Sequence, residues 1–158
     1  MRWLDVPYQR ERHDGWCLPA CVAMVTAYAG HPLSQHDVAR WLGTRFIGTP
    51  ASRIQWLAQR GWQVEYSTGS VENLEEWLQQ SCPVILFVRT GDLRPHWIRD
   101  TPHAVVLAGL DAERAALFDP GLELNQPIMV AIGDLLLAWS PFDYTYAVMR
   151  PASARKKH

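Results

Sequence analysis

Cysteine is scarce in this 158-residue chain, and neither sign of charge prevails. Three cysteines, an odd number, argue against a framework of disulfides and for reduced thiols. With 15 Lys and Arg against 16 Asp and Glu, the net charge of -1 gives no reason to expect a nucleic-acid or an acidic partner. Long hydrophobic runs are also missing, and residues 1–5 lack the apolar stretch of a signal peptide. We therefore expect a cytoplasmic protein without a membrane segment.

The length of the chain suits one domain, because about 150 residues can bury a full hydrophobic core. No internal repeat, low-complexity segment or linker-like stretch divides it. We predict a single domain over residues 1–151 and a flexible basic tail over residues 152–158.

Apolar residues in the first half recur at helical spacing, whereas the second half contains short apolar runs of strand length. Helices are predicted at residues 18–28, 34–43, 49–61, around 74–78, and 134–139. Strands are predicted at residues 83–88, 103–108, 115–118, 127–130 and 144–149. Helices followed by an antiparallel sheet form an α+β arrangement, in which the N-terminal helices pack on the C-terminal sheet.

Cys17 lies where a loop gives way to the first predicted helix, in the run Asp-Gly-Trp-Cys-Leu-Pro-Ala-Cys of residues 14–21. The positive end of a helix dipole and its unpaired N–H groups favour a thiolate over a thiol. This position therefore predicts a nucleophilic cysteine. Cys21 and Cys82 are interpreted as core residues, since isolated cysteines are usually buried.

A base and an orienting acid are predicted at the ends of two consecutive strands. His103 opens one apolar run, and Asp119 closes the next just before Pro120 and a turn. A hairpin between the two runs places the start of the first strand beside the end of the second. We therefore expect His103 and Asp119 to be neighbours.

With these residues in place, the sequence resembles the C39-like cysteine peptidases of the papain-like fold. The bacterial members of that family include the domains of peptide exporters that remove leader peptides. Leu18 stands where the family commonly has glycine. The similar segments follow the family's order over nearly the whole chain: Val-Pro-Tyr-Gln at residues 6–9, Cys-Leu-Pro-Ala-Cys-Val-Ala-Met at 17–24, Pro-Val-Ile-Leu at 83–86, His-Ala-Val-Val at 103–106, Asp-Pro at 119–120, and Leu-Ala-Trp at 137–139.

The resemblance implies a cysteine peptidase with a specific set of site residues. Cys17 would be the nucleophile, His103 the general base and acid, and Asp119 the group that orients the imidazole. Gln9 would donate a hydrogen bond to the oxyanion, although it lies eight positions before Cys17. The thiolate would form a thioester that water resolves, without a cofactor or a metal.

A metal site built from Cys17, Cys21, His31 and His36 is the competing use of these side chains. The spacing does not suit it, because a structural zinc site usually presents a close pair from a turn and a second pair. The eight tryptophans are mostly at helical core spacing, and the balanced charge argues against a surface for nucleic-acid stacking.

Residues 89–102 precede His103 and contain Gly91, Pro95 and Pro102. We expect a loop at the edge of the cleft that contributes to specificity. Trp97 in this loop, and Trp139, are candidates to line a substrate groove, with core packing as the alternative.

Two other functions use the same fold. A C39-like domain can hold an extended peptide without cleaving it, and a Cys-His-Asp site can pass its thioester to an amine instead of water. The substrate stays open at this stage. Because the chain contains neither the membrane segments nor the Gly-x-x-x-x-Gly-Lys motif of an exporter, it would serve a separate transporter, process another protein or act as a toxin-like effector.

Overall fold

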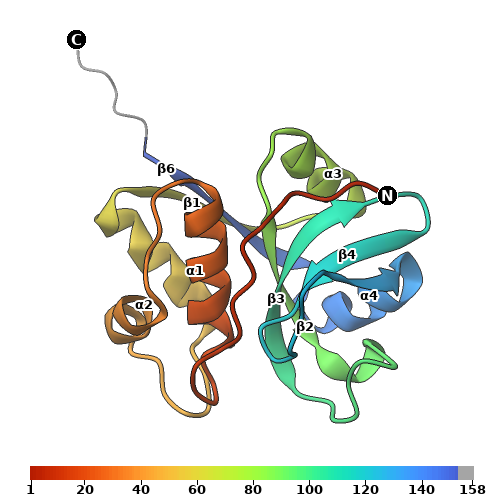
Figure 1. The fold of residues 1–158 in the computed structure, drawn as a ribbon, viewed down its shortest axis with the longest axis horizontal. Helices are drawn as coiled ribbons and strands as arrows, with labels where there is room; N and C mark the ends of the chain where they lie inside the picture. Colours follow the sequence, from red (N-terminus) through yellow and green to blue (C-terminus); the bar gives the residue numbers. More distant parts are fainter. Residues whose placement is uncertain (153–158) are drawn as a thin grey trace.

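The computed structural model of the protein describes residues 1–152 (Figure 1). The predicted basic tail, apart from its first residue, falls on residues 153–158 and so lies outside the described residues. Within residues 1–152, the helices are all too short or too polar to cross a membrane.

The predicted helices are present, with one difference in type. The α-helices are α1 (Cys17–Tyr28), α2 (Gln35–Leu42), α3 (Val71–Gln79) and α4 (Ile132–Trp139), and the 3₁₀-helices are η1 (Ala51–Arg60), η2 (Thr90–Asp92) and η3 (Ser140–Phe142). The segment predicted as a helix after Pro50 is thus a 3₁₀-helix. It ends at Gly61 as expected, because Gly61 adopts the left-handed conformation with φ 89°. Ser34 caps α2 by accepting a hydrogen bond from the Asp37 N–H.

Within residues 1–152, six antiparallel strands form one sheet in the order β1-β6-β2-β3-β4-β5. They are β1 (Trp62–Thr68), β2 (Val84–Arg89), β3 (Pro102–Leu110), β4 (Arg114–Phe118), β5 (Ile128–Ala131) and β6 (Thr145–Pro151). The α+β arrangement is confirmed, but β1 was not predicted. It comes from the helical first half and pairs with β6, from Trp62 opposite Pro151 to Thr68 opposite Thr145.

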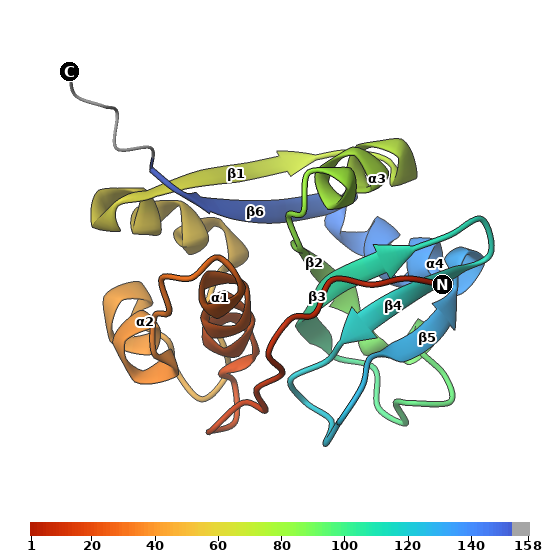
Figure 2. The same ribbon diagram turned by 45° about the horizontal axis from the view of Figure 1, so that its top comes forward.

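Each face of the sheet carries its own hydrophobic core. On β2 and β3 the buried side chains alternate, so that Phe87 and Val106 belong to the core under α1, and Leu86 and Leu107 to the core on the opposite face. The second core includes Leu135 and Trp139 of α4 and Leu74 of α3. Helices α1 and α2 thus lie on one side of β2 and β3, and α4 lies on the other (Figure 2).

The segment before α1 runs along the sheet and reaches the end of β4. The Leu4 N–H donates to the Ala108 carbonyl (2.9 Å), beside a register shift in the β3–β4 pairing. A Cβ on Gly109 would lie 2.6 Å from the Arg2 carbonyl oxygen, so only glycine admits the segment this closely. The Glu11 N–H then donates to the Pro120 carbonyl (2.8 Å). These contacts hold the entry to α1 against the turn that follows β4.

Candidate active site

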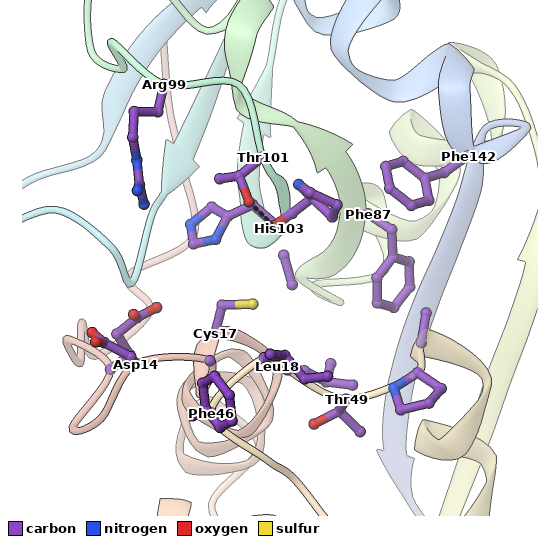
Figure 3. A pocket seen from close by; sticks show the side chains of 18 of the residues that line it. Asp14, Cys17, Leu18, Phe46, Thr49, Phe87, Arg99, Thr101, His103 and Phe142 are labelled. Carbon is purple, nitrogen blue, oxygen red and sulfur yellow. Dashed lines mark hydrogen bonds between the residues drawn. The ribbon is translucent and has the colours of Figure 1, made fainter.

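Cys17 is the first residue of α1, and its half-buried side chain faces His103 across a cleft (Figure 3). Trp16 precedes it at the N-cap position and makes no side-chain hydrogen bond to the first turn. The first backbone N–H groups of α1 can therefore donate to a partner other than the N-cap side chain. The helix dipole also favours negative charge on the Cys17 sulfur. Cys21, one turn later, is fully buried, and burial raises the pKa of its thiol well above the ordinary value.

His103 lies near the start of β3 and is buried. Its Nε2 is 2.6 Å from Oδ1 of Asp119, which leaves Nδ1 for the side of Cys17. Burial alone would lower the pKa of His103, but hydrogen bonds and negative charge from Asp119 and Cys17 outweigh it and raise the pKa from 6.5 to about 10. The imidazole is therefore held as an imidazolium at neutral pH.

Asp119 directly follows β4 and is completely buried. Besides the contact with His103, its carboxylate accepts hydrogen bonds from the Trp97 Nε1–H (2.6 Å, to Oδ2) and the Gly121 N–H (2.8 Å, to Oδ1). A buried charge needs such partners, because an unpaired one is costly to desolvate. The predicted proximity of His103 and Asp119 at the two ends of a hairpin is confirmed.

Trp97 has a larger role than the groove lining considered from the sequence. Its ring meets the His103 imidazole edge-on, with centroids 4.9 Å apart and planes at 61°. Its indole N–H donates a hydrogen bond to Oδ2 of Asp119, the carboxylate oxygen that His103 does not contact. A Cβ on Gly121 would lie 2.7 Å from the Trp97 ring, so the turn after β4 packs directly on the indole. Trp139, by contrast, is fully buried and donates to the Thr145 carbonyl.

Gln9 does not join Cys17, His103 and Asp119, which corrects the expectation from its sequence neighbourhood. Its Oε1 accepts a hydrogen bond from Nε2 of Gln35 (3.0 Å), and it borders a separate surface hollow next to α2. Gln9 is not among the residues that line the cavity of Cys17 and His103.

Glu11, rather than Gln9, borders the cavity of Cys17 and His103, and sequence reasoning missed it. Burial raises the pKa of the Glu11 carboxyl, the His103 charge lowers it, and the Asp119 carboxylate raises it further. Tyr8 supports the same segment by donating from its hydroxyl to the Leu122 and Asp119 carbonyls.

The cavity at this site has a volume of about 660 Å³. It lies between the helical half, which contributes Cys17 and the turn of residues 45–48, and the sheet, which contributes His103. The loop of residues 89–102 supplies Trp97, Arg99 and Thr101 to its wall, as expected for a loop at the cleft edge. Within residues 1–152, no cluster of three or more His, Cys, Asp or Glu side chains is arranged to hold a metal ion.

A thiol at a helix N-terminus, a buried imidazolium and a buried carboxylate behind it have the chemistry to serve as a nucleophile, a proton carrier and an orienting group. Such a set can attack a carbonyl carbon and protonate a leaving amine. A nucleophile opening into a cavity of this size can be reached by an extended substrate.

Comparison with known proteins relates this site to peptidases. Residues 3–146 match the model of the peptidase C39 like family. No curated protein matches the chain.

Solved structures of low sequence identity share the fold. A protein described as a C39-like peptidase from Bacillus anthracis has a TM-score of 0.77 at 16% identity, over 94% of this chain and 98% of that one. The peptidase domain of Streptococcus ComA, a bi-functional ABC transporter, has a TM-score of 0.71 at 18% identity, over 94% and 98%. A double glycine motif protease from an AMS/PCAT transporter, in complex with its leader peptide, has a TM-score of 0.69 at 18% identity, over 94% of both chains. The fold is therefore the papain-like fold of these peptidases.

Proposed function

Because the chain belongs to the peptidase C39 like family, we propose that it is a cysteine peptidase with Cys17 as nucleophile, His103 as base and acid, and Asp119 as the group that orients His103. The observation that carries this proposal is the buried His103–Asp119 contact of 2.6 Å with Cys17 facing the imidazole across an open cavity. A histidine with a raised pKa that lies beside a thiol and borders a cavity is typical of a functional site.

In the proposed reaction, the Cys17 thiolate attacks the carbonyl carbon of a peptide bond. The backbone N–H of Cys17, at the free N-terminus of α1, stabilises the oxyanion. The His103 imidazolium gives its proton to the leaving nitrogen, so that a thioester and an amine form. The imidazole then takes a proton from water, whose oxygen attacks the thioester and releases the acid. Asp119 keeps Nδ1 of His103 directed at the sulfur throughout.

The proposed substrate is a peptide or a protein in the cytoplasm. Two structurally similar proteins are peptidase domains of transporters, one of them crystallised with a leader peptide. We propose that this chain likewise removes a leader peptide or processes a protein, in partnership with a separate transporter.

Alkylation of Cys17 by iodoacetamide tests the proposal directly. The labelling rate is measured against pH for the wild type and for His103→Ala, with Cys17→Ala to assign the signal. Rapid labelling well below the ordinary thiol pKa of about 8.5, lost in His103→Ala, is expected for a thiolate–imidazolium pair. Cys21 and Cys82 are buried and should contribute little.

Slow labelling that follows an ordinary thiol titration would contradict the proposal and favour a domain that binds peptides without cleaving them. If labelling is rapid, the products formed from a peptide substrate separate hydrolysis from acyl transfer, because hydrolysis releases the free acid and transfer yields an amide of the accepting amine.

A further inference from the structure

The cavity has two chemically different ends, with Cys17 between them (Figure 3). The side chains at one end are mostly apolar, with Thr49 as a polar exception, and the apolar ones come from five separate elements or their ends. They are Leu18 of α1, Pro50 and Ala51 at the start of η1, Phe87 of β2, Ala104 of β3 and Phe142 of η3. Charged side chains gather at the other end, where Asp14 and Arg99 lie in Figure 3.

The wall of the apolar end is formed largely by buried core residues. Leu18, Phe87 and Ala104 are buried members of the core under α1, so packing against that core fixes their positions. Phe142 is half-buried and packs against the same core. Side chains held in this way define a preformed pocket rather than a surface that must rearrange.

The mouth of the cavity exposes two more large apolar residues. Phe46 and Ile47 are 79% and 78% exposed, at the tip of the turn in which Arg45 and Gly48 pair with each other. This turn is packed closely on the entry to α1, since a Cβ on Gly15 would lie 2.4 Å from the Phe46 carbonyl oxygen. Exposed apolar groups beside a cavity mark a site where an apolar partner is bound.

The position of His103 decides which part of a substrate meets the apolar end. The leaving nitrogen must lie next to the imidazolium that protonates it, so the leaving part of the substrate extends to the side of His103. Figure 3 places the imidazole, Arg99 and Asp14 on one side of the sulfur, and Leu18, Phe87 and Phe142 on the other. The acyl part of the substrate therefore extends toward the apolar end.

Resting on the proposed function, we infer that the apolar end binds a bulky apolar side chain of the substrate, one or two residues on the acyl side of the cleaved bond. A pair of glycines would leave Leu18, Phe87 and Phe142 without a partner. Full burial of a Leu or Phe side chain contributes about 1.5–3 kcal/mol, which corresponds to roughly 10- to 100-fold in reaction rate. The substrate class is thus a peptide with a large apolar residue before the scissile bond.

Peptidyl chloromethyl ketones test this inference without knowledge of the natural substrate. Their peptide part occupies the acyl side, and the Cys17 thiolate displaces chloride from the methylene carbon to form a thioether. The inactivation rates of acetyl-Gly-Gly, acetyl-Gly-Phe and acetyl-Phe-Gly chloromethyl ketones are compared, each divided by the iodoacetamide rate of the same protein. We expect one of the two Phe compounds to react at least about 10-fold faster than the Gly-Gly compound.

Two variants link the preference to the pocket. Ala51→Trp fills the apolar end, and Phe142→Ala removes part of its wall, so each should bring the Phe and Gly-Gly rates close to each other. Ala112→Trp makes the same replacement as Ala51→Trp in the exposed turn between β3 and β4 and should keep the preference of the wild type.

The outcomes separate this inference from the proposed function. If iodoacetamide labels Cys17 rapidly but the Gly-Gly compound reacts as fast as the Phe compounds, the apolar pocket is refuted and the peptidase proposal stands. If iodoacetamide labelling is itself slow, both fail. A preference for Phe that persists in Ala51→Trp and Phe142→Ala would place the binding site elsewhere and overturn the inference.

Discussion

The Trp97 indole and the Asp119 carboxylate are joined by a hydrogen bond of 2.6 Å, to the oxygen that His103 does not use. One oxygen therefore serves the imidazole, and the other is held by a residue of the loop between β2 and β3. Hydrogen bonds at both oxygens restrict rotation of the Asp119 carboxylate. The carboxylate therefore holds the His103 imidazole in one orientation. The loop that borders the substrate cavity thus also supports the base.

Trp97→Phe should keep the ring beside His103 and remove the N–H. A hydrogen bond to a charged group typically contributes about 1.5–3 kcal/mol, so the free energy of unfolding should fall by roughly that amount. Because Asp119 loses one restraint on its position, kcat should fall more than KM rises. Urea unfolding and steady-state kinetics measure the two effects, with Trp56→Phe on the exposed face of η1 as the control. An unchanged kcat would show that Trp97 does not position the carboxylate.

Asp119→Asn should move the pH dependence of the nucleophile. In the wild type, burial lowers the pKa of His103, but Asp119 and Cys17 raise it to about 10, so the imidazolium survives to alkaline pH. Without the carboxylate the folded-state pKa drops, and the alkaline limb of the kcat/KM profile should shift to lower pH.

The raised pKa of His103 also makes the free energy of unfolding depend on pH. A histidine whose folded pKa lies above its unfolded value of 6.5 stabilises the fold fully below pH 6.5 and loses that contribution as pH rises through 10. Wild-type unfolding free energy should therefore decline between pH 6.5 and 10 relative to Asp119→Asn. Denaturant titrations across this range would contradict the assignment if the two proteins declined in parallel.

Glu11→Gln should stabilise the protein at neutral pH. Burial raises the pKa of the Glu11 carboxyl above 4.5, so the ionised form is unfavourable in the fold. Below pH 4.5 the Glu11 carboxyl is neutral and does not destabilise the fold. As the pH rises through its raised pKa, the buried carboxyl ionises and the free energy of unfolding falls. Glu11→Gln should therefore gain stability over wild type at pH 8 but not at pH 4. Exposed Glu113→Gln is the matched control and should show no such gain.

Gly121→Ala should damage the site, whereas Gly133→Ala should not. A Cβ at position 121 would lie 2.7 Å from the Trp97 ring and 3.2 Å from the His103 ring, so both must shift. Position 133 has no atom within 4 Å of a Cβ and lies in α4, where alanine favours the helix by about 0.5–1 kcal/mol. Thermal unfolding and kcat/KM of the two variants provide the test. Equal activity in both would mean that the indole position is not critical.

The sequence predicted the parts of the fold in which local pattern and packing agree. The apolar runs of β2, β3 and β4 are buried on both faces, so their limits were recognisable, and the hairpin brought His103 to Asp119 as expected. Strand β1 was missed because only alternate side chains pack on the core, and its neighbour β6 lies more than 75 residues away in the chain.

The side chains around Cys17 were harder to predict than the contact between His103 and Asp119. Gln9 and Glu11 are two residues apart, and which of them reaches the cleft depends on the hydrogen bond from Glu11 N–H to Pro120. The role of Trp97 depends on the path of a loop that has no regular pattern. Both depend on long-range contacts, which no spacing within the chain encodes.

The first eleven residues connect the two halves of the cleft. They bond in turn to β3 through Leu4, to the turn after β4 through Tyr8, and to Pro120 through Glu11, and six residues later the same chain provides Cys17. They act as a strap that, together with the core that α1 shares with β2 and β3, holds Cys17 in place opposite His103. Adjustment to different substrates is then left to the rim, in the turn of residues 45–48 and the loop of residues 89–102. A protease that nicked the strap would therefore be expected to loosen the alignment of Cys17 with His103 without unfolding the core that α1 shares with β2 and β3.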